Sequence, residues 1–165
     1  KEILSWKDAH KNLSVRFIDE SNLHLPLVPP WYVHSNEANE LIETLKLVQK
    51  NFSPFILKFS RISYGPNPKK LRLIRVTGPS SKELSELKKN IENVLKKPEE
   101  NRPFIPHLTI ARFRPETFGA FEIKNLEENI IWKQKVENFT LFESRLMRTG
   151  AIYKPLHKFN FPKNH

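Results

Sequence analysis

The sequence predicts an α+β fold, in which short strands are joined partly by hairpins and partly by helices. Three segments show apolar residues at helical spacing, several short extended runs are bounded by turn residues, and no low-complexity linker divides the chain. Hydrophobic residues make up 38% of the 165 residues and include 12 Phe, which is enough apolar material for a folded core. We therefore expect a single domain over residues 1–165, with about seven strands and three helices.

The first part of the chain alternates helices with extended segments. The spacing of apolar residues predicts a helix over residues 1–13. Residues 15–18 and 23–28 are extended and apolar, and they predict two short strands that end at a Pro-Pro pair. Ser35 is a suitable N-cap for a second helix, which continues to about Asn51 with apolar residues at intervals of three and four.

The sequence pattern in the middle of the chain predicts a hairpin followed by a helix. Residues 54–60 and 71–76 have the composition of strands, and the Gly-Pro-Asn-Pro sequence at 65–68 between them is a strong turn signal. A serine pair at 80–81 can begin a third helix, which has its apolar residues on one side and ends at Pro98. The two strands should therefore pair before the chain enters this helix.

Three further extended segments complete the prediction: residues 104–113, 139–147 and 151–161. The first follows a polar loop at 99–103, and residues 114–130 show no clear period, so we expect a loop with one short element there. The last two should form a hairpin that turns at the Thr-Gly pair 149–150. Pro155 favours an edge position in that hairpin, because proline cannot donate a backbone hydrogen bond.

Composition restricts the classes of function. Lys and Arg number 28 against 18 Asp and Glu, and the resulting net charge of +10 favours a polyanion such as RNA or DNA, although it also fits a merely soluble protein. The absence of cysteine excludes disulfides, thiolate nucleophiles and Cys-ligated zinc. Because neither an apolar run of about 20 residues nor a secretory signal is present, we expect a cytoplasmic protein that does not bind membranes.

Two segments carry a similar tetrapeptide, His-Leu-Pro-Leu at 24–27 and His-Leu-Thr-Ile at 107–110. Residues two apart on a strand share a face, so the second copy presents the imidazole of His107 and the hydroxyl of Thr109 together. The intervening apolar residues should face the core, which applies to Leu25, Leu108 and Ile110. If the two strands lie side by side, His24 and His107 face each other across a solvent-accessible groove.

Such a pair of histidines suits acid–base chemistry on a phosphodiester. An imidazole changes its charge near neutral pH, so one ring can accept a proton while the other donates one, with no metal required. Thr109 can hold a non-bridging phosphate oxygen, and Arg112 is a candidate to neutralise the charge that builds up in the transition state. The competing interpretation is a chance match, in which each histidine is an ordinary polar residue of a strand.

The same segments resemble the two signatures of the two-histidine (2H) phosphoesterase superfamily, and within it the 2′-5′ RNA ligase and RNA 2′,3′-cyclic phosphodiesterase family. The first is Asn-Leu-His-Leu-Pro-Leu-Val-Pro-Pro at 22–30, and the second is Phe-Ile-Pro-His-Leu-Thr-Ile-Ala-Arg-Phe at 104–113. The second is the more specific, because it contains the proline, His-x-Thr-x, Ala and Arg of the family pattern. The turn at 64–68 and the closing segment at 144–159 agree, so the resemblance covers about residues 13–161.

The resemblance implies a bilobal, approximately twofold symmetric fold, with antiparallel sheets lining a central groove and helices outside. Each lobe should contribute one histidine motif to the groove. It also implies an activity on RNA ends or cyclic nucleotides, in which a 2′,3′-cyclic phosphate is opened to a 2′-phosphate and 2′-5′ ligation is the reverse. One histidine activates water or a ribose hydroxyl and the other protonates the leaving oxygen, and the roles of His24 and His107 stay open. We expect a monomer without cofactor or metal.

Two departures from the family pattern bear on activity. Pro26 stands in the substrate-binding position where the family carries Thr or Ser, and a proline donates no hydrogen bond. Loss of one donor to a developing anion costs about 10²–10³ in rate. The chain is then a weakened enzyme, an enzyme with a substitute donor, or an RNA- or nucleotide-binding module of the same fold. Family members also begin with an apolar strand, whereas Lys1 lies almost directly in the first predicted helix.

Other residues are candidates for contact with RNA. Tyr153, Trp31 or Tyr32 could stack on a base, and Tyr153 is favoured because it lies on the closing strand. Core packing is the competing interpretation for each of them. Four cations of the predicted hairpin could follow an RNA backbone or form an ordinary solvated face: Lys69, Lys70, Arg72 and Arg75.

Overall fold

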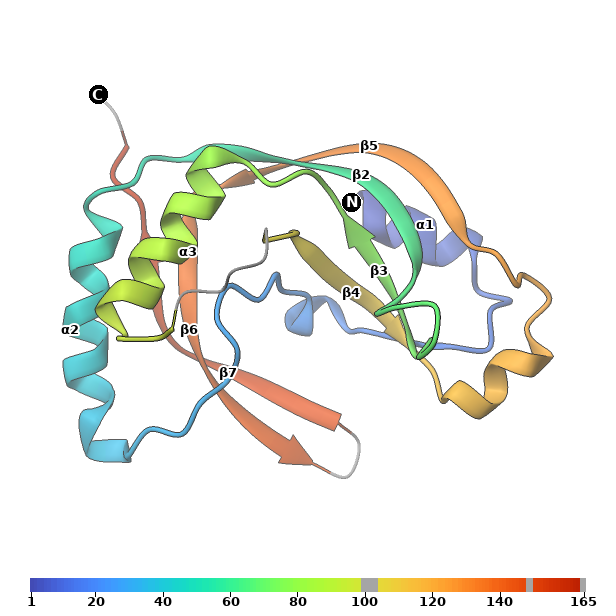
Figure 1. Ribbon diagram of the computed structural model, residues 1–165, viewed down its shortest axis with the longest axis horizontal. Coiled ribbons are helices and arrows are strands. Elements are labelled where there is room, and N and C mark those ends of the chain that lie inside the picture. The colour runs from blue at the N-terminus through green and yellow to red at the C-terminus, as the bar shows by residue number, and fades with distance from the viewer. Residues whose placement is uncertain (99–103, 148–149, 164–165) are drawn as a thin grey trace. The chain divides into compact units, whose positions relative to one another are not determined.

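The computed structural model describes residues 1–98, 104–147 and 150–163 (Figure 1). The chain divides into two compact units. The first consists of Lys1–Pro26, Lys58–Pro79 and Ile105–Lys133. The second consists of Leu27–Leu57, Ser80–Phe104 and Gln134–His165. Among the described residues, no helix combines the length and apolar character that a bilayer span requires.

A five-stranded sheet organises the first unit. Its order is β1-β4-β3-β2-β5, and the pairs β1–β4, β4–β3 and β3–β2 are antiparallel. The strands are β1 (Arg16–Phe17), β2 (Phe55–Gly65), β3 (Leu73–Thr77), β4 (His107–Arg112) and β5 (Glu127–Val136). The expected hairpin between residues 54–60 and 71–76 is confirmed, but β2 is longer than predicted and pairs with β3 through its last residues, from Arg61 to Gly65.

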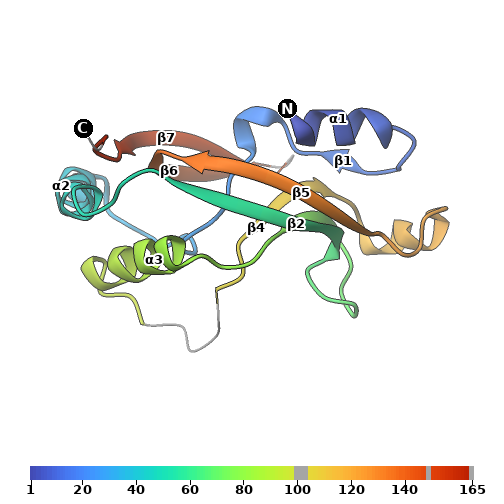
Figure 2. The same cartoon turned by 90° about the horizontal axis from the view of Figure 1, so that it is seen from above.

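One face of this sheet is the core of the first unit. Ile62, Ile74, Val76 and Ile110 have no exposed surface. The helix α1 (Glu2–Ala9) lies beside β1, as Figure 2 shows. Its buried Trp6 contacts the ring of Phe17 edge-on at 6.5 Å and donates a hydrogen bond to Glu128 Oε2 at 2.7 Å.

An aromatic cluster closes one end of the same unit. Tyr64 contacts the rings of Phe113, Phe118 and Phe121, with centroids between 5.1 and 6.2 Å away. Its hydroxyl donates to the Ile123 carbonyl at 2.7 Å, and burial raises the pKa of Tyr64 above its usual value. Phe118 belongs to the short helix η3 (Pro115–Ala120). One short element was expected within residues 114–130, but β5 also begins there, at Glu127.

The described part of the second unit contains two α-helices, one short 3₁₀ helix and a two-stranded sheet. Its elements are η2 (Ser35–Glu37), α2 (Ala38–Gln49), α3 (Lys82–Val94), β6 (Asn138–Met147) and β7 (Gly150–Asn160). Ser81 caps α3 as predicted, because its hydroxyl accepts a hydrogen bond from the Leu84 amide at 3.1 Å. Phe139 and Phe159 stack at 4.6 Å between the paired strands, and Phe159 is fully buried.

Three sequence expectations need correction. Residues 23–28 form no strand and instead follow the short helix η1 (Glu20–Asn22), because Pro26 and the Pro-Pro pair remove backbone donors from this stretch. Ser35 begins η2 and does not cap α2. The strand β5 was not predicted, since its charged residues obscure the alternation of its two faces. The expected loop at 99–103 and the turn residue Thr149 lie outside the described residues.

Candidate active site

His24 and His107 both lie in the first unit, whose first segment ends at Pro26. That each lobe supplies one motif stays a prediction. One correction concerns His24, which follows η1 in an irregular segment where a strand was expected. The pairing of β1 with β4 joins the N-terminal segment to the sheet that carries the second motif. His107 lies on a strand, as predicted, but this strand, β4, begins at His107 and not at residue 104.

The two histidines share a local arrangement of hydrogen bonds. His24 Nδ1 lies 2.7 Å from the Asn22 carbonyl oxygen, and His107 Nδ1 lies 3.1 Å from the Ile105 carbonyl oxygen. A carbonyl oxygen only accepts hydrogen bonds, so Nδ1 carries the proton in both rings. In the neutral ring Nε2 then holds the lone pair, which is the arrangement that a general base requires. The similarity of the two tetrapeptides therefore extends to the backbone around them.

A β-bulge in β4 decides which side chains share a face. The pairing of β3 with β4 shifts by one residue, so that Arg75 lies opposite Thr109 while Ile74 lies opposite Ala111. Ile110 is the extra residue, and it is fully buried together with Ala111. Because one extra residue reverses the alternation, Arg112 lies on the same face as Thr109. The alternation alone would have placed Arg112 on the opposite face.

The strand register brings further polar residues to this face. Thr77 lies opposite His107, Arg61 lies opposite Thr77, and Arg16 lies opposite Arg112. Residues that are directly opposite in neighbouring antiparallel strands share a face. We define the arginine face by its members, which come from four neighbouring strands: Arg16, Arg61, Ser63, Arg75, Thr77, His107, Thr109 and Arg112. Its cationic character suits it to anionic ligands.

The burial of the apolar motif residues is confirmed in part. Ile110 is fully buried, as expected, whereas Leu25 and Leu108 are half-buried. His24, Pro26, His107 and Thr109 are half-buried as well, and Arg112 is exposed. Each of these side chains therefore retains some exposure to solvent, as a site for a soluble substrate requires.

A family model described as the 2′-5′ RNA ligase superfamily matches residues 5–146 of the chain. The chain belongs to this superfamily. The match includes both histidine motifs and the whole five-stranded sheet, so membership agrees with the resemblance of the two signatures.

Two relatives of this superfamily member are both named RNA 2′,3′-cyclic phosphodiesterase. The RNA 2′,3′-cyclic phosphodiesterase of Aquifex aeolicus is 22% identical over 165 residues, which cover 93% of this chain and 85% of the relative. The protein of the same name from Archaeoglobus fulgidus is 28% identical over 148 residues, which cover 88% of this chain and 83% of the relative.

Solved structures show the same fold. TT0787 of Thermus thermophilus matches with a TM-score of 0.78 and 20% identity, over 99% of this chain and 92% of that one. Escherichia coli LigT in complex with 3′-AMP matches with a TM-score of 0.70 and 23% identity, over 96% of this chain and 88% of that one. The mixed fold of helices and antiparallel sheets is thus that of LigT-like 2H phosphoesterases.

The aromatic candidates lie in the second unit of the superfamily member. Tyr153 is half-buried on β7 and contacts the ring of Phe142 edge-on at 6.2 Å. The Trp31 ring has Lys97 Nζ 4.8 Å from its centroid, whereas Tyr32 is fully exposed. Base stacking by Tyr153 stays a prediction.

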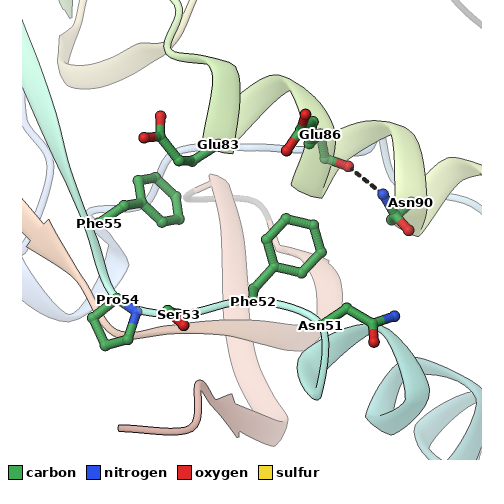
Figure 3. Close-up of a pocket in the computed structure, with 8 residues that line it drawn as sticks. All are labelled: Asn51, Phe52, Ser53, Pro54, Phe55, Glu83, Glu86 and Asn90. Carbon is green, nitrogen blue, oxygen red and sulfur yellow. Dashed lines mark hydrogen bonds between the residues drawn. The ribbon is translucent and has the colours of Figure 1, made fainter. Parts of the chain in front are cut away.

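A separate pocket of about 440 Å³ lies in the second unit, next to α3. Figure 3 shows its residues, and the rings of Phe52 and Phe55 point into the space between α3 and the segment before β2. Glu83 and Glu86 contribute carboxylates to its lining, and such groups disfavour a phosphate ligand. None of the residues predicted for the site lines this pocket. Within the described ranges, no group of three or more His, Asp or Glu side chains is arranged to hold a metal ion.

Sequence reasoning missed part of the arginine face. Arg75 was considered only as one cation of a basic hairpin, and Arg16, Arg61, Ser63 and Thr77 were not singled out. A signal was present, because Arg61-x-Ser63 and Arg75-x-Thr77 repeat the spacing of His107-x-Thr109 on strands. Recognising it required the register, which places the three pairs side by side.

Proposed function

We propose that this protein is a metal-independent RNA 2′,3′-cyclic phosphodiesterase that acts as a monomer. The observation that carries the proposal is the common sheet face of His107, Thr109 and Arg112, within a chain that belongs to the 2′-5′ RNA ligase superfamily. Relatives named RNA 2′,3′-cyclic phosphodiesterase support the choice of substrate. The net charge of +10 is consistent with a polyanionic substrate.

In the proposed reaction, one histidine removes a proton from water as the water oxygen bonds to phosphorus. The bond between phosphorus and O3′ breaks, and the other histidine donates a proton to O3′, which leaves a 2′-phosphate. The protonation of Nδ1 in both rings supports either histidine as the base, so the assignment between His24 and His107 stays open. If a 5′-hydroxyl replaces water, the same steps form a 2′-5′ linkage.

Thr109 and Arg112 have supporting roles in this proposal. The Thr109 hydroxyl donates to a non-bridging oxygen of the phosphate, and the Arg112 guanidinium balances the negative charge of the transition state. Both act from one side of the phosphate, because they share the face of His107. Tyr153 is proposed to stack on the base of the substrate.

The test is hydrolysis of an oligonucleotide that ends in a 2′,3′-cyclic phosphate, measured in EDTA. The wild-type protein should form product, and His24→Ala and His107→Ala should each lower kcat/KM by about 10²–10⁴-fold, the range for a general acid or base. Equal activity of wild type and both variants would refute catalysis by the histidines. Activity that EDTA abolishes and a divalent metal restores would refute the metal-independent mechanism.

A second candidate rests on Pro26, which offers no hydroxyl in the first motif. The chain would then bind RNA or nucleotides at the same face without turnover. This candidate predicts salt-sensitive binding of single-stranded RNA and no product, even with excess protein.

A further inference from the structure

Arg75 occupies an unusual position on the arginine face. It lies directly opposite Thr109 on one side and Ser63 on the other, in the middle strand of the three that carry these residues. Its Nε atom is buried and has no hydrogen-bond partner in the described structure. A buried donor without a partner is destabilising, so such a group usually serves a ligand or another function.

Gly65 on β2 shows where the Arg75 side chain lies. A Cβ atom added at Gly65 would lie 3.0 Å from Arg75 Nε and 3.1 Å from its Cδ. The stem of Arg75 therefore passes over Gly65, on the strand farther from His107. Because β2 is two strand spacings from β4, about 9–10 Å, the guanidinium is displaced toward β2 from the phosphate proposed at His107 and Thr109.

We propose that Arg75 binds a second phosphate of the substrate, next to the cyclic phosphate that is hydrolysed. This inference rests on the proposed function and adds a preference: the substrate class is an oligonucleotide with at least one internucleotide phosphate, in place of a cyclic mononucleotide. Arginine suits this role because its planar fork pairs with two phosphate oxygens. Arg61 is less suited, since its Nη1 lies 3.8 Å from Glu127 Oε1.

The test compares three substrates that all end in a 2′,3′-cyclic phosphate. They are a mononucleotide, a dinucleotide with a normal phosphodiester, and the same dinucleotide with an uncharged methylphosphonate linkage. Arg75→Gln should lower kcat/KM for the normal dinucleotide by about 10-fold to 100-fold, as expected for a lost charge-assisted hydrogen bond. It should change the other two substrates by less than about twofold.

Two further variants separate this role from general effects. Gly65→Ala keeps Arg75 but places a methyl group against its stem, and should reproduce the same selective loss. Lys11→Gln removes one positive charge from the turn after α1, where Lys11 is 75% exposed and pairs with Asp8, and should affect no substrate selectively. The thermal midpoint of each variant reports whether the fold is retained.

Equal losses on all three substrates, or no loss on any, would overturn the inference. If the wild type hydrolyses none of them, the proposed function fails, and binding then decides the role of Arg75. The probes are the two dinucleotides with a terminal 2′-phosphate, titrated at several salt concentrations. Arg75→Gln should weaken only the phosphodiester form and reduce its salt slope by about 0.7. Equal weakening of both forms, or of neither, would contradict the inference.

Discussion

Arg112 lies on the same face of the sheet as His107, although the two residues have opposite parity along β4. The extra residue Ile110 accounts for this, because it has no partner in β3 while its neighbours Thr109 and Ala111 do. Ile110 and Ala111 are consecutive, and both are fully buried. The bulge thus gives the core two consecutive apolar residues and returns Arg112 to the polar face.

Replacement of Arg112 tests the consequence of the bulge for catalysis. Arg112→Met should lower kcat/KM for a cyclic-phosphate oligonucleotide by about 10²–10³-fold, since one group that stabilises the developing anion is lost. Arg114→Met is the matched control, because Arg114 is also exposed and lies two residues past the strand. Comparable losses in both variants would show that Arg112 contributes only general charge.

Ile110, the extra residue of the bulge, is also expected to contribute to the stability of the fold. Ile110→Ala should lower the free energy of unfolding by about 2–5 kcal/mol, because a fully buried side chain leaves a cavity when it is truncated. Ile131→Ala is the control, since Ile131 is 90% exposed on β5 and should change stability by less than about 0.5 kcal/mol. Urea unfolding measures both. Equal effects of the two substitutions would contradict the assigned burial.

Pro26 provides a test of the two candidate functions. Pro26→Thr restores a hydroxyl to the first motif, and should raise kcat by about 10²-fold or more if the missing donor limits the natural chain. The comparison uses single-turnover rates on one oligonucleotide. No gain over an already active parent would show that another group supplies the donor. Binding without product in both proteins would favour the non-catalytic module.

Tyr64 gives a prediction for the pH dependence of stability. Burial raises its pKa above the usual 10.0, so the folded state holds the phenolic proton more tightly than the unfolded state. The resulting stabilisation is fully present below pH 10 and is lost as the pH rises through the folded pKa. The stability difference between wild type and Tyr64→Phe should therefore be smaller at about pH 11 than at about pH 8. A difference that does not change with pH would contradict this.

Much of the fold could be predicted from local patterns. The β2–β3 and β6–β7 hairpins, α3 with its Ser81 cap and the strand that begins at His107 all have clear signals in turn residues or periodicity. The prediction of a strand over residues 23–28 was wrong. This apolar run resembles a strand, but Pro26 lacks the backbone N–H that strand pairing requires. The alternation in β5 was hidden because Glu128 shares a face with Ile130 and Trp132.

The candidate site was predictable only in its motif residues. His24, His107, Thr109 and Arg112 follow from the two signatures, whereas the face of Arg112 depends on a bulge that no local pattern indicates. The role proposed for Arg75 rests on its register with Thr109 and on its close approach to Gly65. Both are long-range relations between strands, which a single sequence does not contain.

The most direct measurement is ³¹P NMR of the products formed in ¹⁸O-water from an oligonucleotide that ends in a 2′,3′-cyclic phosphate. The proposed mechanism predicts a 2′-monophosphate that carries one ¹⁸O, because water attacks phosphorus and O3′ leaves. His24→Asn and His107→Asn should each leave the cyclic phosphate unchanged over the same period. A 3′-monophosphate, or a 2′-monophosphate formed equally by wild type and both variants, would contradict the proposal that these two histidines hydrolyse the cyclic phosphate.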